Sequence, residues 1–335
     1  MKLSEIGEFG FIDRFSGKFS SLNEAKVSGI GDDCAIMPLD DEYEQIVTTD
    51  LLIEDIHFIR SAITAFDLGY KALAVNLSDI AAMGGEPTAS FLSIALPGDT
   101  DIEYMDDVME GYRALSEKYK VPLLGGDTTK SPTKIIINVC VTGRVKKNQA
   151  KLRTSAKEND MICVTGSLGD SGAGLKILLE NIKTDENTAS LVSWHNRPEP
   201  AIKEGLWLGQ KKGVHAMMDI SDGIASDLQH ILNKSGVSAT IDMDKLPLSD
   251  ALIQTCDKNR WDATELAITG GEDYRLLLTV NASDIDSLTK QYNRIFSDPL
   301  TTVGQITGDS HKSIKWLKSN NLHTPGKGGF NHFSD

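Results

Sequence analysis

Residues 66–84, FDLGYKALAVNLSDIAAMG, carry apolar side chains at helical spacing and run into the glycine pair Gly84-Gly85. This spacing predicts a helix that ends at the two glycines. Asn76 and Asp79 are three residues apart, so they should lie on one face of this helix. On either side of it, EQIVTTD at 44–50 predicts a strand that ends in polar residues, and ASFLSIAL at 89–96 predicts a buried strand.

The rest of the chain also mixes helical and strand-like segments. In the first half we predict a helix at 103–119, a short strand at Val121–Leu124 that runs into Gly125-Gly126-Asp127, and a strand at Ile135–Val141. In the second half we predict strands at 161–165, 238–242, 264–269 and 275–280, helices at 175–181, 200–212 and 224–235, and a polar loop or cap at 183–200. Several strands are close together along the chain, which favours an α+β fold over a purely doubly wound sheet.

A polar and basic segment, RVKKNQAKLRTSAKEND at residues 144–160, interrupts this pattern near the middle of the chain. Such segments are typical of domain boundaries. A length of 335 residues is long for one hydrophobic core and comfortable for two. We therefore predict two domains, residues 1–145 and 146–335.

The charge balance limits the class of partner. The formal net charge is −14, so no basic field exists to replace the counterions of a nucleic acid, and we expect no nucleic-acid partner. An acidic protein that handles phosphates needs metal cations to bridge the like charges. A negative net charge also keeps a protein soluble, whatever its partners. The charge alone therefore does not decide between these two interpretations.

The cysteines and the apolar segments indicate where the protein works. The four cysteines are far apart and form no Cys-x-x-Cys pair, which fits a reducing compartment better than a disulfide framework. The N-terminus opens no apolar signal stretch, and no run approaches the ~20 apolar residues of a membrane-spanning helix. We predict a cytoplasmic protein without a membrane segment.

Six short acidic motifs are spread along the chain. They are Gly29-Ile-Gly-Asp-Asp33, Thr48-Thr-Asp50, Asn76-Leu-Ser-Asp79, Gly125-Gly-Asp127, Asp219-Ile-Ser-Asp-Gly223 and Gly270-Gly-Glu-Asp273. Carboxylates and hydroxyls are hard oxygen ligands suited to Mg²⁺, and glycines let a phosphate approach the backbone. A solvated loop or a helix cap explains one such motif equally well. Six motifs with the same chemistry favour a site that the fold assembles.

Several common enzyme classes leave no signature in the sequence. There is no Gly-x₄-Gly-Lys-Ser/Thr loop, no protein-kinase signature, no His-Glu-x-x-His motif and no EF-hand spacing. The acidic motifs instead fit a phosphoryl transfer that depends on positioning and charge neutralisation. Several Mg²⁺ ions could bridge two phosphorylated molecules, held by Asp33, Asp50, Asp79, Asp127 and Asp219, with Thr48 and Thr49 as further oxygen ligands.

Two glycine-rich segments offer places for a phosphate. The backbone N–H groups of Gly125-Gly126 could reach phosphate oxygens. The loop GSLGDSGAG at 166–174 could do the same with a helix N-terminus, although a tight strand-to-helix turn explains it nearly as well. Both interpretations of this loop stay open at this point.

The ordered motifs resemble those of the thiamine-monophosphate kinase family from about residue 5 to Phe330. The resemblance is carried by GIGDDCA at 29–35, TTD at 48–50, YKALAVNLSD at 70–79 with AAMG at 81–84, GGDTT at 125–129, VTG at 164–166, DISDG at 219–223 and GGEDY at 270–274. This family is part of the aminoimidazole ribonucleotide synthetase-like superfamily. The resemblance implies two α/β domains with ATP between them and a homodimer built through the N-terminal sheets. The implied reaction is direct in-line transfer from ATP to thiamine monophosphate, which gives ADP and thiamine diphosphate without a covalent nucleophile.

The resemblance also implies roles for individual residues. The implied magnesium ligands are Asp33, Thr48, Thr49, Asp50, Asp79, Asp127, Asp219 and Asp222. The implied nucleotide contacts are Gly126, Asp127, Arg153 and Ser221, and the implied contacts of thiamine monophosphate are His57, Glu272 and Phe330. Asp50, Asp127 and Asp219 would support the transfer. Without the resemblance, Arg153 is best explained as a linker charge, His57 as a structural residue and Phe330 as a tail residue on the core. Arg275 departs from the family pattern, in which an acidic residue is expected.

Two other classes of function compete with this one. Other superfamily enzymes are disfavoured, because the first thirty residues lack a reactive Cys near a Lys, as selenophosphate synthetase requires, and the C-terminus lacks the cysteine of the hydrogenase maturation factor. The motif Gly-Gly-Glu-Asp-Tyr disfavours aminoimidazole ribonucleotide synthetase. A non-catalytic sensor of nucleotides or thiamine phosphates need not keep a full set of magnesium carboxylates. Turnover distinguishes a sensor from an enzyme, since a sensor binds without releasing ADP.

Overall fold

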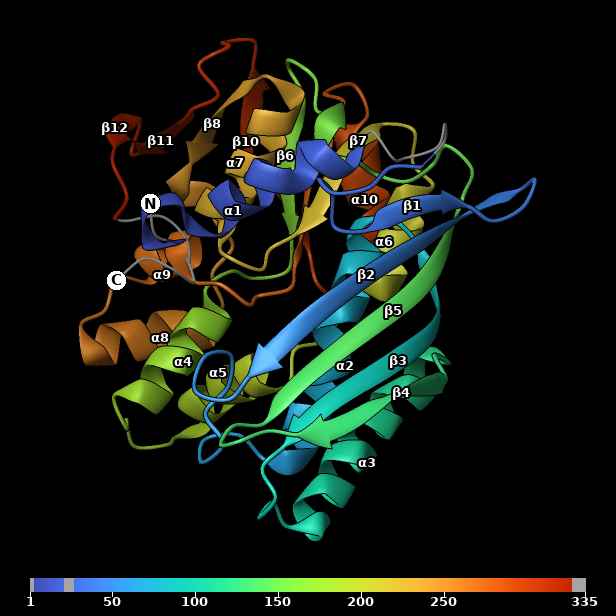
Figure 1. The fold of residues 1–335 in the computed structure, drawn as a ribbon. Coiled ribbons are helices and arrows are strands. Elements are labelled where there is room, and N and C mark those ends of the chain that lie inside the picture. Colours follow the sequence, from blue (N-terminus) through green and yellow to red (C-terminus); the bar gives the residue numbers. More distant parts are fainter. Residues whose placement is uncertain (1–2, 21–26, 327–335) are drawn as a thin grey trace.

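The computed structural model describes residues 3–20 and 27–326, and each half of the chain contains one β-sheet (Figure 1). The first half contains β1 (Ala35–Pro38), β2 (Tyr43–Ile53), α2 (Ala65–Ala82), β3 (Glu86–Leu96), α3 (Ile102–Tyr119), β4 (Leu123–Lys130) and β5 (Ile136–Lys146). Its sheet has the order β1-β2-β5-β3-β4, in which β3 and β4 are parallel and the other neighbours antiparallel. Helices α2 and α3 cover one face of this sheet, and the other face is open (Figure 1).

The second half carries a seven-stranded sheet surrounded by helices. Its strands are β6 (Met161–Thr165), β7 (Val214–Asp219), β8 (Ser238–Asp242), β9 (Leu276–Val280), β10 (Leu300–Thr307), β11 (Ile314–Lys318) and β12 (Asn321–His323), in the order β12-β11-β8-β10-β6-β9-β7. Its helices are α4 (Asp170–Leu179), α5 (Glu186–Asn196), α6 (Ile202–Gly209), α7 (Ile224–Ser235), α8 (Asp250–Asn259), α9 (Ala263–Thr269) and α10 (Ile285–Ile295). Helix α1 (Leu3–Ser20) precedes the first sheet. The predicted α+β class with two α/β halves is confirmed.

Helix α2 is the central element of the first half. Thr64 begins it, because the Thr64 hydroxyl accepts a hydrogen bond from the backbone N–H of Asp67 at 3.0 Å. Almost all of its residues are buried. Two glycines let α3 approach it closely: a Cβ on Gly69 would lie 1.7 Å from the carbonyl oxygen of Val108, and a Cβ on Gly111 would lie 1.8 Å from that of Phe66. The helix therefore fits a narrow slot between the sheet and α3.

Three element predictions are wrong, and each has a local cause. Residues 264–269 form helix α9 and not a strand, because the Asp262 carboxylate accepts from the N–H groups of Thr264 and Glu265 and starts a helix. Residues 183–200 contain helix α5, which begins with a capping box between Asp185 and Thr188. Strand β4 continues through the glycines to Lys130.

The two halves share one apolar core. Leu73 and Leu77 of α2 belong to the same hydrophobic cluster as Met217 of β7 and Tyr292 of α10. Helix α6 lies against α2, and a Cβ on Gly205 would lie 2.3 Å from the carbonyl oxygen of Ala81 in α2. This close contact joins the halves by packed backbone and apolar side chains.

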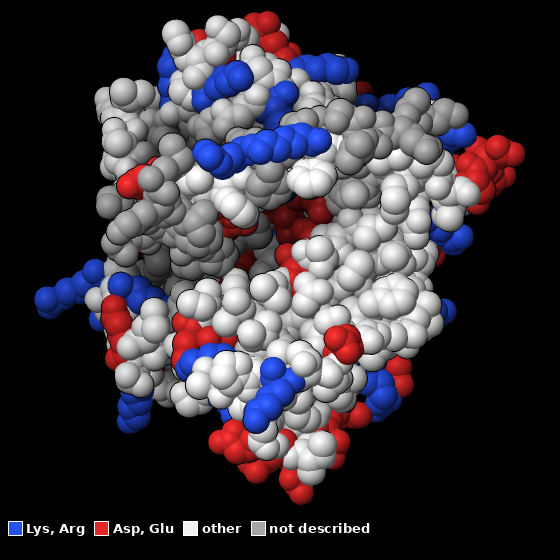
Figure 2. Space-filling view, viewed as in Figure 1, with Lys and Arg blue, Asp and Glu red and all other residues white. Residues whose placement is uncertain are grey.

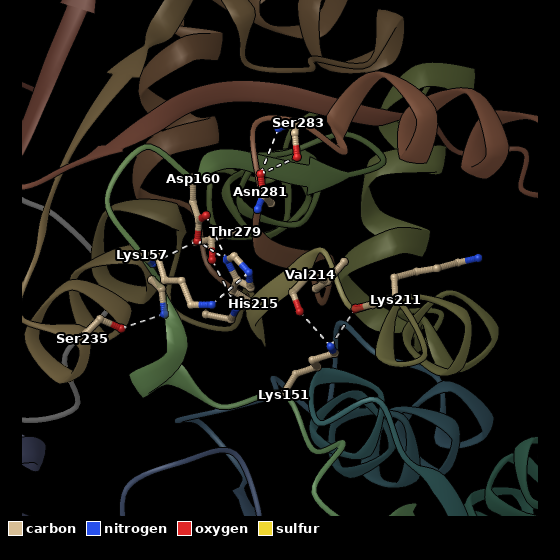
Figure 3. A network of polar contacts seen from close by, with 12 residues as sticks. Lys151, Lys157, Asp160, Lys211, Val214, His215, Ser235, Thr279, Asn281 and Ser283 are labelled. Atoms are coloured by element: carbon tan, nitrogen blue, oxygen red, sulfur yellow. Dashed lines mark hydrogen bonds and ion pairs between the residues drawn. The ribbon is translucent and has the colours of Figure 1, made fainter.

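The segment between the sheets is anchored to the second half (Figure 3). The Lys151 ammonium donates to the backbone carbonyls of Lys211 at 2.9 Å and Val214 at 2.7 Å, and burial lowers its pKa to about 8. Further along, His215 contacts the Asp160 carboxylate at 2.9 Å. The polar composition of residues 144–160 thus serves specific contacts. The predicted boundary between residues 145 and 146 coincides with the last residues of β5 and stays a prediction.

The helices of the described ranges, 3–20 and 27–326, include none with the length and apolar character needed to span a bilayer.

Candidate active site

Three carboxylates from distant parts of the sequence meet between the two halves. They belong to Asp33 before β1, Asp79 in α2 and Asp219 at the end of β7, and one oxygen of each lies within 4.8 Å of the others. Figure 2 shows a hollow in the surface, slightly above the centre of the view, with Asp and Glu side chains at its floor. The fold therefore gathers three of the six acidic motifs into one cluster.

Neighbouring side chains and backbone groups fix the orientation of this cluster. The Thr48 hydroxyl donates to Asp79 at 2.5 Å, and the Ser78 hydroxyl donates to Asp219 at 2.6 Å. The backbone N–H of Asp50 donates to the Asn76 side chain at 3.0 Å. Asn76 and Asp79 thus both face strand β2, which confirms that they share a helix face.

The carboxylates of the cluster and of the neighbouring Asp50 repel one another. Burial, and then the charge of Asp33, raises the pKa of Asp50 to about 6 and that of Asp219 to about 7. The pKa of Asp79 is raised well above its usual value, first by burial and then by Asp50 and Asp219. Such a cluster is stabilised by protons or by a bound cation.

One oxygen of the cluster is ready for a ligand. Arg153, from the turn Arg153–Ser155, pairs with one oxygen of Asp33, and its backbone N–H donates to Asp32 at 2.7 Å. The other oxygen of Asp33, Oδ2, is buried and has no hydrogen-bond partner among the described residues. A carboxylate oxygen without a hydrogen-bond partner has a free lone pair for a ligand. Such hard oxygen ligands fit a divalent cation such as Mg²⁺. Arg153 lies at this cluster, and its predicted contact with the nucleotide stays a prediction.

A further acidic pair lies beside the cluster. The backbone N–H of Asp222 donates to the buried carboxylate of Asp227 at 3.2 Å. Burial, and then Asp222 and Asp219, raise the pKa of Asp227 well above its usual value. Asp227 was not predicted from the sequence, although it follows the Asp219-Ile-Ser-Asp-Gly223 motif by one helical turn.

Glu272 links this cluster to a second polar group. Its backbone N–H donates to the carbonyl of Ser221 at 2.7 Å, so the Gly-Gly-Glu-Asp turn lies directly on the Asp219–Gly223 loop. The pKa of Glu272 is lowered: burial raises it, but the charges of Lys71, then His195 and His57, outweigh burial. His57 and Glu272 are therefore neighbours, and their contacts with the substrate stay predictions.

Lys71 and His195 were not predicted as site residues. Lys71 is fully buried in α2 and pairs with Glu272 at 3.0 Å, and His195 of α5 lies 3.2 Å from the same Glu272 oxygen. Burial, and then the charge of Lys71, lower the pKa of His195 to about 4, so its ring is neutral at pH 7. A lysine inside an almost wholly buried helix was the available signal for Lys71.

Within one chain, Asp127 and Gly126 do not lie in the cluster. Asp127 pairs with Ser93 of β3, which pairs with Asn138 of β5, which in turn pairs with Leu51 of β2. Asp127 is thus three strands from β2, roughly 14 Å at the usual strand spacing, and on the outer face of the sheet. Thr49 is exposed on that face too, and its hydroxyl accepts from Asn138 at 2.9 Å. The roles predicted for these residues stay predictions.

Comparison with known proteins identifies the family. Residues 31–145 match the family described as AIR synthase related protein, N-terminal domain, and residues 157–317 match its C-terminal domain. The chain is 36% identical to the thiamine-monophosphate kinase of Salmonella typhimurium (strain LT2) over 330 residues, which cover 98% of both chains. The chain belongs to the thiamine-monophosphate kinase family. It is also 36% identical to the thiamine-monophosphate kinase of Bacillus subtilis (strain 168), over 91% of this chain and 93% of the relative.

A solved structure of a family member agrees with the fold throughout. The structure described as AaThiL complexed with AMPPCP and TMP superposes with a TM-score of 0.85 at 33% sequence identity and covers 99% of both chains. The family indicated by the ordered motifs is thereby confirmed. The coverage also confirms that both halves of this chain follow the two-domain fold of thiamine-monophosphate kinase.

Two features of the C-terminal half bear on the family pattern. The N-terminus of α4 is capped by the buried Asp273 carboxylate, which accepts from the N–H groups of Gly169 at 2.6 Å and Ser171 at 3.1 Å. The loop at 166–174 is therefore a tight turn whose N–H groups have a protein partner. Arg275, where the sequence analysis expected an acidic residue, lies 4.1 Å from the centre of the Trp194 ring and pairs with Asp298 at 2.5 Å.

Phe330 lies outside the described residues, and its contact with the substrate stays a prediction.

Proposed function

We propose that this protein catalyses the ATP-dependent phosphorylation of thiamine monophosphate to thiamine diphosphate. Its relatives are thiamine-monophosphate kinases over nearly the whole chain. A structure of similar fold holds AMPPCP and TMP. The single observation in this molecule that carries the proposal is the buried cluster of Asp33, Asp79 and Asp219, because it can be neutral only with protons or metal cations.

The residues of the cluster would hold the cations that the reaction needs. Bound Mg²⁺ would neutralise the phosphates of the two substrates and allow them to approach each other. Asp33, Asp50, Asp79 and Asp219 would supply carboxylate oxygens, and the hydrogen bonds of Thr48, Ser78 and Asn76 orient them. Asp222 is placed next to this set, with its N–H on Asp227.

The remaining residues of the site would bind the two substrates. Arg153 lies at Asp33, where its guanidinium would contact phosphate oxygens of the nucleotide. Ser221 would contact the nucleotide from the loop on which Glu272 rests. Glu272 and His57 would contact the thiamine portion of the substrate, with Phe330 as a third contact. We propose direct in-line transfer without a covalent nucleophile on the protein, because each catalytic group assigned here is a metal ligand or a charge.

We also propose a homodimer built through the open face of the N-terminal sheet. The large apolar side chains exposed on its strands are Leu51, Phe91, Leu123 and Leu124. In Figure 2 the surface to the right of the hollow and just below it, over part of this sheet, is mostly white, with charged side chains toward its lower edge. A mostly uncharged apolar face of this kind is typical of a permanent protein interface. Asp127 lies on this face and Gly126 is its neighbour in β4, so in such a dimer both would lie close to the second copy.

We place the reaction in the cytoplasm. All four cysteines are free, and three of them are buried. Free cysteines fit a reducing compartment. Cell fractionation followed by immunodetection of the protein in each fraction would test this placement.

The test of the proposed reaction is product formation from ATP, Mg²⁺ and thiamine monophosphate, with free thiamine in place of the monophosphate as the control. We expect ADP and thiamine diphosphate in equal amounts from the monophosphate and no product from thiamine. ADP without thiamine diphosphate would indicate another substrate. Binding of both ligands without any ADP would overturn the proposed catalysis in favour of a sensor.

A further inference from the structure

The strongest unassigned feature of the molecule is a buried lysine at the junction of its halves. Lys71 has no exposed surface, although it is the one charged residue in the middle of the apolar helix α2. Its ammonium donates to the backbone carbonyl of His195 at 3.1 Å and to Oε2 of Glu272 at 3.0 Å. A buried cation is strongly destabilising unless such partners compensate it.

Glu272 is held in a defined geometry by contacts from both halves. His195 lies 3.2 Å from Oε2, so Lys71 and His195 approach the same carboxylate oxygen. The side chain keeps 24% of its surface exposed, and among the described residues no hydrogen bond reaches its other oxygen, Oε1. The backbone of Glu272 has φ 63°, a left-handed conformation that residues other than glycine rarely adopt. One oxygen is thus fixed by the protein and the other is left for a bound molecule.

A purely structural role does not explain this ion pair. The halves are already joined by a continuous apolar core that includes Leu77 and Met217. A buried ion pair in such a core contributes little net stability compared with apolar side chains of similar size. An ion pair that leaves its carboxylate partly exposed beside the cluster is instead typical of a binding group that must stay charged and oriented.

We propose that Lys71 is a positioning residue for substrate recognition: from the N-terminal half it orients Glu272 of the C-terminal half and keeps its carboxylate negatively charged, as an acceptor for an N–H group of the substrate. This inference rests on the proposed function, in which Glu272 contacts the thiamine portion of thiamine monophosphate; the aminopyrimidine of that portion carries an amino group that can donate to a carboxylate. A protonated or rotated Glu272 would offer the amino group a weaker acceptor. Lys71 itself does not touch the substrate.

The first experiment replaces the charge of Lys71 and separates the two substrates. In Lys71→Met we expect KM for thiamine monophosphate to rise about 10- to 100-fold, while KM for ATP changes by less than about twofold. Lys71→Arg keeps the charge and should retain most of the affinity for thiamine monophosphate. If Lys71→Met does not fold, Lys71→Gln replaces it, because the amide still donates to the carbonyl of His195.

The matched control is Lys118→Met. Lys118 of α3 pairs with Glu199 at 2.5 Å, so this ion pair also joins the two halves, but it is exposed. We expect both KM values to stay at the wild-type level in this variant. An equal rise of KM for thiamine monophosphate in Lys118→Met and Lys71→Met would assign the effect to the junction in general and overturn the proposal.

The second experiment tests whether Lys71 acts through Glu272. In Glu272→Gln the acceptor is already uncharged, so adding Lys71→Met should change KM for thiamine monophosphate by less than about twofold. Full additivity of the two substitutions would overturn the proposal.

The third readout is the pH dependence of KM for thiamine monophosphate between about pH 6 and 8. The groups that face Glu272 are Lys71 of α2, His195 of α5 and His57 after β2, and Tyr274 of its own turn has a pKa raised well above the usual value by burial and by Glu272. Without Lys71, burial would raise the pKa of Glu272, so KM should rise as pH falls in Lys71→Met and less so in the wild type. The wild type and Lys71→Met both contain His57. The readout is therefore the difference between the two proteins in how steeply KM for thiamine monophosphate changes with pH. Parallel slopes would count against the proposal.

Direct calorimetric binding of thiamine monophosphate separates this inference from the proposed function. A wild-type protein that binds but does not phosphorylate it overturns the proposed function, and the effect of Lys71→Met is then measured on Kd. A wild-type protein that does neither overturns both. Phosphorylation with an unchanged KM in Lys71→Met overturns the role of Lys71 alone.

Discussion

Asp50 lies among carboxylates that, together with burial, raise its pKa to about 6. A raised carboxyl pKa destabilises the metal-free folded state above that pH, because the unfolded state prefers the ionised form. We therefore expect Asp50→Asn to raise the Tm of the metal-free protein at pH 7.5 by a few degrees, on the order of 3 °C, and to lower kcat at least ~100-fold. Thermal unfolding without Mg²⁺ and turnover at saturating Mg²⁺ measure the two effects.

The control for this substitution is Asp106→Asn on the solvent-exposed side of α3. It should change neither Tm nor kcat. Unchanged turnover of Asp50→Asn at saturating Mg²⁺ would remove Asp50 from the catalytic set.

His195 gives the protein a pH-dependent stability. Its pKa is lowered to about 4, so between pH 6.5 and pH 4 the unfolded chain binds a proton that the folded chain does not. The free energy of unfolding should fall as pH decreases, by about 2 kcal/mol between pH 7 and pH 5 from this group alone. Urea unfolding at several pH values should show that the free energy of unfolding depends less on pH in His195→Gln than in the wild type. The same slope in both proteins would assign the pH dependence to other groups.

The sequence allowed the acidic cluster to be predicted better than its surroundings. Asp33, Asp79 and Asp219 belong to short motifs in which an acidic residue lies near Gly, Ser or Thr. This pattern by itself indicates metal or phosphate binding. Lys71 and His195 carry no such pattern, because their roles depend on contacts across more than one hundred residues of sequence. The apolar pattern around Lys71 signals a buried lysine, but its partners Glu272 and His195 could not be predicted, because they meet it only through the fold.

The contact between α2 and α3 depends on two glycines. A Cβ on Gly69 would meet the carbonyl of Val108 at 1.7 Å, and neither helix can shift without disturbing the sheet or the acidic cluster. We expect Gly69→Ala to lower the free energy of unfolding by about 3 kcal/mol, despite the better helix propensity of alanine. Urea unfolding measures this change.

Gly98→Ala is the matched control, since a Cβ there meets only the end of the Lys130 side chain at 3.7 Å. Its effect should stay below about 1 kcal/mol. Equal stability of Gly69→Ala and the wild type would show that the helices can separate at little energetic expense.

Long periodic elements were predictable and short apolar ones were not. Helices α2 and α7 follow the predicted ranges closely, because several turns of regular spacing define them. Residues 264–269 are too few for their apolar pattern to separate helix from strand, and the cap on Asp262 decides it. The glycines of β4 resembled a strand end. They continue the strand because β4 stays paired with β3 through Gly125 and Gly126, and a glycine is needed at 126 because the backbone of Leu92 leaves no room for a Cβ.

The position of Asp127 on the open face of the sheet leads to a test of the whole assembly. If each site takes Asp50 from one chain and Asp127 from its partner, mixed dimers of Asp50→Asn and Asp127→Asn chains contain one intact site and one doubly altered site. Random mixing should then restore about a quarter of the wild-type activity from two inactive variants. Co-expression of the two chains with different affinity tags, followed by turnover measurement, tests this.

The controls are each variant paired with itself under the same conditions, which should stay inactive. No recovery in verified mixed dimers would show that every site is complete within one chain.

The two-part organisation was visible in the sequence, but the continuity of the core was not. Hydrophobic periodicity shows which faces of α2 are apolar without showing what covers them. The cover of one face comes from α6 and β7, more than one hundred residues later in the chain.

The contact of Gly84 and Gly205 with backbone from the opposite half has a consequence for how such enzymes can be recombined. A chimera that joins the first half of this chain to the second half of a distant relative would need matching backbone at α2 and α6 as well as a compatible linker. Chimeras with a crossover between β5 and β6 should therefore be insoluble unless α6 and β7 are exchanged together with the first half. In evolution, too, the halves would change as one inherited unit.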